Sequence, residues 1–200
     1  MENSKRSIIS LIIKKAKKWK VRFDSLILKN ILKSYSIDFC FINRMGIVTK
    51  RQENDNFEYI LNTKNSCDAL PLMEKLDKYV KNSKISFDIG ANIGITSIWL
   101  SRNSEKVYAF EPEAKNILRL RDNLKINNIE NIEIIETAVS NRTGRANLNL
   151  LESYGHHSLG DVNTSKKIGV QKVCLDTIDN FCKERNIKEI NDITGPANIV

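Results

Sequence analysis

Residues 84–102 read KISFDIGANIGITSIWLSR and form the most informative segment of the chain. The first six of these residues, KISFDI, include the apolar residues Ile85, Phe87 and Ile89 and predict a short strand of the buried type. The glycines within 90–94 predict a sharp turn, and a helix is expected over 94–102. A glycine-containing turn between a strand and a helix allows backbone N–H groups to approach a ligand closely.

Strands and helices continue to alternate along the chain. Strands are expected at 106–110 (KVYAF) and 132–136 (IEIIE), with a helix over 113–127 between them. Strands that alternate with helices through short connections predict a parallel sheet within a three-layer α/β sandwich. Right-handed crossover connections would place the three strands side by side in the sheet.

After residue 138 the pattern changes. Apolar residues alternate in 145–151 and again in 170–175, which predicts an antiparallel pair joined by a long loop. A helix is expected over 176–185 with Asp176 as its N-cap, and a turn over 192–196 precedes a strand-like segment.

The chain has 200 residues, and we expect three parts along it. Residues 1–33 predict a basic amphipathic helix, and residues 34–83 a small subdomain with a β-hairpin and a helix. The α/β domain would occupy 84–200.

Charge is concentrated in the first part. The net charge is +8, and residues 1–33 alone carry ten Lys or Arg and two acids, so the remainder is neutral. A neutral body disfavours a nucleic-acid partner. A basic amphipathic helix containing Trp19 can lie on an anionic membrane surface through residues 5–33, or it can dock on its own domain with solvated lysines. Both interpretations stay open.

The cysteines and histidines indicate neither a metal centre nor a disulfide framework. The four cysteines form no CxxC pair, and no carboxylate or histidine spacing resembles a ligand set. No apolar run is long enough to cross a bilayer. We therefore expect a cytoplasmic protein with reduced thiols, and the basic segment adds the hypothesis of contact with the inner membrane surface.

The turn carries an acid where a dinucleotide site would not. Its pattern is Asp88-x-Gly90-x-Asn92-x-Gly94 and differs from GxGxxG, the fingerprint for a pyrophosphate. A carboxylate beside the turn suits a cationic ligand. The ammonium and sulfonium of S-adenosylmethionine fit this requirement, and a diphosphate does not.

The next two strands end in residues that complete a nucleoside site. Glu111 follows the second strand, where an acid can accept both ribose hydroxyls. Thr137 and Ala138 follow the third strand, and such small residues leave room for a flat adenine.

These segments closely resemble the FkbM family of S-adenosylmethionine-dependent methyltransferases. The resemblance covers about 56–200 and is sharpest where D-x-G-A-N-x-G is followed by an E-P pair. It implies a Rossmann-like class I methyltransferase fold and O-methylation of a hydroxyl on a saccharide, glycan or natural product. It also implies that the methionyl part is held by Asp88, Gly90, Ala91, Asn92 and Gly94, the ribose by Glu111, and the adenine near Thr137 and Ala138. The segments that carry it are FDIGANIGITSIWLSR (87–102), VYAFEPEAKN (107–116), NLKINNIENIEIIETAVSNRTGRANLNL (123–150) and VCLDTID (173–179).

The sequence departs from the family at its end. In the family, a fourth strand runs into an acidic I-D-V-E-G-A-E motif, and we align that strand with 197–200, which predicts a C-terminally truncated, incomplete sheet. The alternative alignment, which we favour less, places Asp192-x-Thr194-Gly195 on D-x-E-G.

Removal of the acceptor proton requires a base, for which His156 and His157 are the candidates. The competing interpretation is a polar loop with two exposed histidines. Two further functions stay open: a catalytically incomplete cofactor-binding fragment or partner subunit, and an NAD-dependent oxidoreductase, which the absence of GxGxxG disfavours.

Overall fold

The computed structural model describes residues 40–42, 47–50, 73, 77, 80–151, 159 and 166–195. All of these residues belong to one of the two compact units into which the chain divides. The predicted N-terminal helix over 1–33 lies outside the described residues, as does most of the helix predicted within 34–83.

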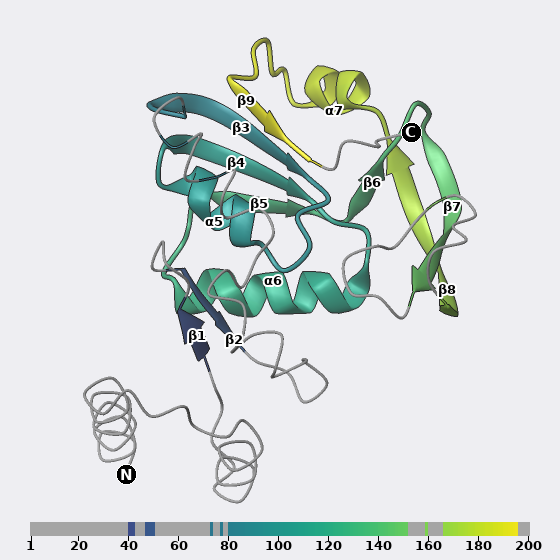
Figure 1. Ribbon diagram of the computed structural model, residues 1–200. Coiled ribbons are helices and arrows are strands. Elements are labelled where there is room, and N and C mark those ends of the chain that lie inside the picture. Colours follow the sequence, from purple (N-terminus) through teal and green to yellow (C-terminus); the bar gives the residue numbers. More distant parts are fainter. Residues whose placement is uncertain are drawn as a thin grey trace, which may run out of the picture. The chain divides into compact units, whose positions relative to one another are not determined.

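The central sheet contains four parallel strands in the order β5-β4-β3-β9 (Figure 1). The three strands predicted from the sequence are confirmed and lie side by side. The strand bounds are β3 Ser83–Ile89, β4 Ser104–Phe110, β5 Ile132–Ile135 and β9 Asp192–Thr194.

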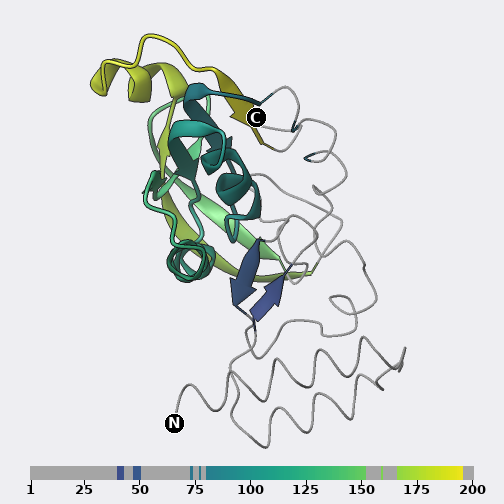
Figure 2. The same ribbon diagram turned by 90° about the vertical axis from the view of Figure 1, so that its left-hand side faces the viewer.

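In the described part of the chain, three helices cover the two faces of this sheet. They are α5 (Ile95–Ser101), α6 (Ala114–Ile126) and α7 (Ile178–Glu184). Helix α6 runs alongside the strands in Figure 1 and is seen end-on in Figure 2. Because side chains alternate along a strand, β4 supplies both cores. Its Val107 and Ala109 pack with α5 and α6, whereas Tyr108 and Phe110 pack with α7. This confirms the three-layer α/β architecture.

The core beneath α7 is aromatic. Phe181 of α7 lies edge-on to Phe110 at 4.9 Å and to Tyr108 at 5.1 Å between ring centroids, and Phe87 of β3 completes the cluster at 5.7 Å. Edge-to-face pairs contribute about 0.5–1.5 kcal/mol each beyond the area that they bury. These contacts fix α7 on the sheet.

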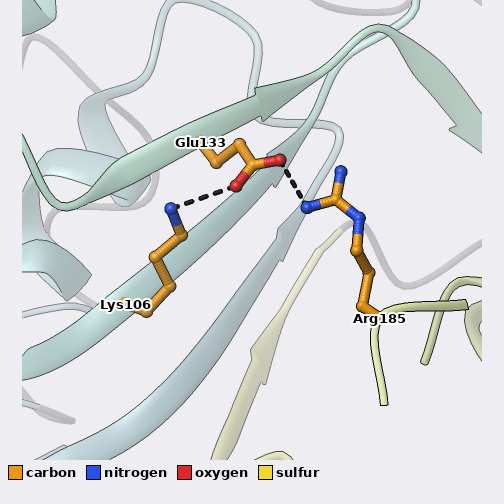
Figure 3. Close-up of polar contacts among 3 residues, drawn as sticks. All are labelled: Lys106, Glu133 and Arg185. Atoms are coloured by element: carbon orange, nitrogen blue, oxygen red, sulfur yellow. Dashed lines mark hydrogen bonds and ion pairs between the residues drawn. The ribbon is translucent and has the colours of Figure 1, made fainter. Parts of the chain in front are cut away.

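An ion-pair network borders this cluster (Figure 3). Glu133 of β5 accepts from Arg185 at 2.6 Å and from Lys106 at 3.0 Å. Partial burial works against ionisation, but the hydrogen bonds from Arg185 and Lys106 hold the pKa of Glu133 below its ordinary value. The guanidinium also lies over the Phe181 ring, 5.1 Å from its centroid. The network ties the end of α7 to β4 and β5.

A second sheet and a hairpin complete the described structure. The strands β6 (Thr137–Val139), β8 (Lys167–Asp176) and β7 (Gly144–Leu151) form a sheet in the order β6-β8-β7. Strands β7 and β8 are antiparallel, which confirms the predicted pair. Strands β1 (Cys40–Ile42) and β2 (Val48–Lys50) pair antiparallel, as predicted for the region before residue 83.

Two local predictions are wrong. The N-cap of α7 is Thr177, whose hydroxyl accepts from Asn180 N at 3.0 Å. Asp176 instead ends β8, and its carboxylate accepts from Thr177 N at 2.8 Å. Aspartate and threonine are both good caps, and the strand pairing of Asp176 with Val139 decides between them.

The second wrong prediction concerns residues 192–196. Asp192–Thr194 is the strand β9, paired with Ser86–Asp88 of β3, and is not part of a turn. Asn191 precedes it, and its Oδ1 accepts from Lys84 N at 2.9 Å and from Ile85 N at 3.0 Å. These contacts with β3 override the turn propensity of Gly195. The strand position agrees with the alignment that we favoured less, on Asp192-x-Thr194-Gly195.

Candidate cofactor site at the carboxyl ends of β3 and β4

The predicted turn after β3 is present and docks on the end of β4. Gly90 and Asn92 have positive φ angles of 74° and 52°, a conformation that glycine and asparagine adopt most readily. The N–H groups of Gly90 and Ala91 both donate to the Phe110 carbonyl at 2.9 Å. Gly90 is exposed, so its backbone is open to a ligand.

Gly94, at the N-cap of α5, is required for packing. Its φ is 86°, and an added Cβ would lie 2.0 Å from Cδ1 of Leu120 on α6. Leu120 is fully buried and has little freedom to move away. Ala91 is 5% exposed and packs in the same core. These two residues hold the turn close to α6.

Asp88 lies beneath the turn, at 3% exposure. Its Oδ2 accepts from Ser97 Oγ of α5 at 2.5 Å, and its Oδ1 accepts from Thr194 Oγ1 of β9 at 2.9 Å. Burial raises the pKa of the Asp88 carboxyl above its ordinary value, and the two hydroxyl bonds oppose this shift only in part. The carboxylate therefore joins β3 to helix α5 and to strand β9.

Glu111 lies at the end of β4, at 5% exposure. Its Oε2 accepts from Asn92 N in the turn at 2.7 Å. Its Oε1 accepts from Glu113 N at 2.9 Å and from Asn116 Nδ2 at 3.3 Å. Burial raises the pKa of Glu111, and these N–H donors limit the rise.

In the structure, both predicted acids bond to the turn and helix that follow β3. Asp88 lies near the end of β3 and bonds to Ser97 of α5, and Glu111 reaches across from the end of β4 to Asn92 in the turn. Both carboxylates face neutral donors in these contacts. The arrangement combines two buried anions with an exposed glycine backbone.

The remaining predicted site residues lie either in the second sheet or outside the described residues. Thr137 is half-buried in β6. Ala138 is 7% exposed and packs in the core of the second sheet with Leu148 and Val173. His156 and His157 lie outside the described residues, so their role as base stays a prediction.

Sequence reasoning missed three residues that the structure adds to this site. Ser97 and Thr194 bind Asp88, and Gln171 of β8 binds the segment after Glu111. Serine, threonine and glutamine at such positions resemble ordinary surface residues in the sequence. The start of α5 brings Ser97 to Asp88, the pairing of β9 with β3 brings Thr194 there, and β8 carries Gln171. Within the described part of the chain, no three His, Cys, Asp or Glu side chains are grouped as a metal site would need. No helix among the same residues is long and apolar enough to span a bilayer.

A comparison with protein families identifies the family of this chain. Residues 88–194, more than half of the chain, match the model described as the methyltransferase FkbM domain. The matched region begins at the buried acid of the turn and ends at the last residue of β9. It includes both acids and all three residues that sequence reasoning missed.

The individual proteins that this chain resembles share limited sequence identity with it and match only part of its length. An uncharacterized protein, MJ1452, of Methanocaldococcus jannaschii is 33% identical over 61 residues, which is 30% of this chain and 24% of that protein. A putative methyltransferase from Streptococcus mutans, solved in complex with SAH, is 20% identical with a TM-score of 0.32 and covers 48% of this chain and 56% of its own. M. jannaschii TYW2 in complex with AdoMet is 15% identical with a TM-score of 0.38, covering 54% and 52%. The match thus covers about a quarter of the length of MJ1452 and about half of the length of each of the two solved proteins.

Proposed function

This chain belongs to the FkbM methyltransferase family, and we propose that it transfers a methyl group from S-adenosylmethionine to a hydroxyl of an acceptor molecule. The observation that carries the proposal is a pair of buried carboxylates that bond to one strand–turn–helix unit with an exposed glycine: Asp88 of that unit bonds to Ser97, and Glu111, after β4, bonds to Asn92. The family match covers both acids.

The residues present fit the cofactor. The Glu111 Oε2 that holds Asn92 N can accept a second hydrogen bond, because a carboxylate oxygen has two acceptor positions. We assign this position to a ribose hydroxyl. We assign the cationic methionyl part to the neighbourhood of Asp88 and Gly90, where a negative charge lies beneath an open backbone. Thr137 and Ala138 are proposed to lie near the adenine.

When bound, S-adenosylmethionine supplies an electrophilic methyl group on a sulfonium centre. The chain must then align the acceptor oxygen with that methyl group, which is mainly a positioning effect. It must also take the hydroxyl proton, and His156 or His157 is proposed as the base. For the acceptor we propose a saccharide, glycan or natural product, as the family resemblance implies.

Titration calorimetry tests the cofactor assignment. We expect the full chain to bind S-adenosylhomocysteine and S-adenosylmethionine but not NADH. Glu111→Gln should weaken binding by roughly tenfold to a hundredfold, because a hydrogen bond to a charged group contributes about 1.5–3 kcal/mol. Glu105→Gln is a matched control, since Glu105 is exposed near the opposite end of the same strand. If the wild type bound NADH and neither sulfur ligand, the proposal would be overturned.

We further propose that the protein works in the cytoplasm and contacts the inner membrane surface through residues 5–33. The support is the sequence alone, which places ten Lys or Arg and a single acid, Asp24, within this segment. Full-length protein should float with vesicles that contain phosphatidylglycerol and not with pure phosphatidylcholine. Replacing the lysines of 14–20 by glutamine should abolish flotation; unchanged flotation would exclude this role.

A further inference from the structure

Gln171 bonds the second sheet to the connection between β4 and α6. Its Nε2 donates to the Pro112 carbonyl at 2.8 Å, and its Oε1 accepts from Ala114 N at 3.2 Å. The side chain lies on β8 and is half-buried. A single amide thus binds a carbonyl and an N–H that lie two residues apart.

The chemistry of the two partners requires an amide of this length. Pro112 offers an acceptor, and Ala114 is the first residue of α6, whose N–H has no partner within the helix. Glutamine provides a donor and an acceptor on one planar group, and this orientation is the one that satisfies both partners. Glutamate, with nearly the same shape, accepts from Ala114 N but cannot donate to the Pro112 carbonyl when ionised.

The residue between these two partners is Glu113. Its N–H donates to Glu111 Oε1 at 2.9 Å, and its own carboxylate caps α6 by accepting from Asn116 N at 2.7 Å. Gln171 therefore holds the backbone on both sides of the N–H that orients the Glu111 carboxylate. A shift of this three-residue segment would move that N–H and rotate the acid.

We propose that Gln171 is a positioning residue that keeps the Glu111 carboxylate in the orientation that accepts a ribose hydroxyl of the cofactor. The inference rests on the proposed function, because it assumes that Glu111 binds the ribose. It also explains why the β7–β8 pair belongs to the site. The face of β8 that carries Gln171 also carries Val173 and Leu175, which pack on Ala138. One strand face thus supports both the ribose acid and the proposed adenine region.

Calorimetry with two ligands tests this role. The probes are S-adenosylhomocysteine and its analogue without the two ribose hydroxyls. Gln171→Leu should weaken binding of S-adenosylhomocysteine by roughly threefold to thirtyfold, or about 0.7–2 kcal/mol, because a misoriented Glu111 keeps only part of its hydrogen bonding to the ribose. The same variant should change the affinity for the analogue by less than about twofold. Lys172→Leu is the matched control, since Lys172 is the exposed neighbour on the same strand.

The isosteric variant Gln171→Glu guards against misfolding, because it preserves shape and removes only the donor to Pro112. We expect Gln171→Glu to weaken binding of S-adenosylhomocysteine and to leave the affinity for the analogue without ribose hydroxyls nearly unchanged. Equal weakening of both ligands, or no weakening of either, would overturn the positioning role while leaving the proposed function intact. A wild type that binds neither ligand would instead overturn the proposed function, and with it this inference.

Discussion

Replacing Gly94 by alanine tests whether close packing of the turn on α6 holds the site together. The added methyl would lie 2.0 Å from Leu120 Cδ1, far inside van der Waals contact, and alanine would have to adopt a φ of 86°. Leu120 has no exposed surface, so the clash must push either the side chain or the helix.

Two costs combine in this variant. An L-residue in the left-handed region costs about 1–2 kcal/mol, and overpacking a full core costs about 1–3 kcal/mol. We therefore expect Gly94→Ala to lower the free energy of unfolding by about 2–5 kcal/mol, a large part of the about 5–15 kcal/mol of a typical domain. With a urea m-value of about 2.5 kcal/mol/M, the midpoint should fall by roughly 1–2 M.

A double-mutant cycle separates the two costs. Leu120→Ala alone should destabilise through the cavity that it leaves, but in the Gly94→Ala background it also removes the clash. The double variant should therefore be more stable than the sum of the single changes predicts, by about 1–3 kcal/mol. Gly144→Ala is the control for backbone strain, since Gly144 has a φ of 131° and an added Cβ would meet nothing within 4 Å. Additive effects in the cycle would refute the packing argument.

Three other outcomes follow from the described contacts. Thr177→Ala should lower the free energy of unfolding in urea by about 1 kcal/mol, the usual loss for an N-cap; no change would return the capping role to Asp176. Burial raises the folded-state pKa of Asp88, so this carboxyl costs stability as pH rises above its ordinary pKa of 3.8. The stability of Asp88→Asn relative to wild type should accordingly increase with pH, and a difference that is constant or falls would contradict the burial argument. Glu133 has the opposite sign, because its pKa is lowered: Glu133→Gln should cost about 0.5–1 kcal/mol at neutral pH, and that cost should vanish as pH falls below the ordinary value of 4.5. A loss that persists in acid would mean that packing, not charge, matters there.

The sequence pattern correctly predicted the helices, strands and turns whose formation depends on residues close together in the chain. The strand at 84–89, the turn glycines and the helix over 113–127 each combine hydrophobic period with turn or cap residues, and all three are confirmed. The order of strands also followed, because short crossovers leave few alternatives. The two acids were located for the same reason, since Asp88 lies near the end of one predicted strand and Glu111 directly follows another.

Long-range contacts account for what the sequence did not predict. β9 has only three residues and is followed by Gly195, so nothing local distinguishes it from a turn. Its identity comes from Asn191 and Thr194, which bond to residues more than a hundred positions away. Gln171 is similar, because its partner Pro112 lies 59 residues earlier. Side chains that act across strands carry no periodic pattern of their own.

The chemistry of Asp88 supports our proposal that this site takes a cationic ligand. The carboxylate is buried, and its described hydrogen bonds come from the neutral hydroxyls of Ser97 and Thr194. Neutral donors compensate for desolvation only in part, which is why the pKa of Asp88 is raised. An ammonium or sulfonium nearby would add the attraction that hydroxyls cannot provide and would lower that pKa. Cofactor binding and ionisation of Asp88 should therefore favour each other, whereas a diphosphate at the same turn would oppose ionisation.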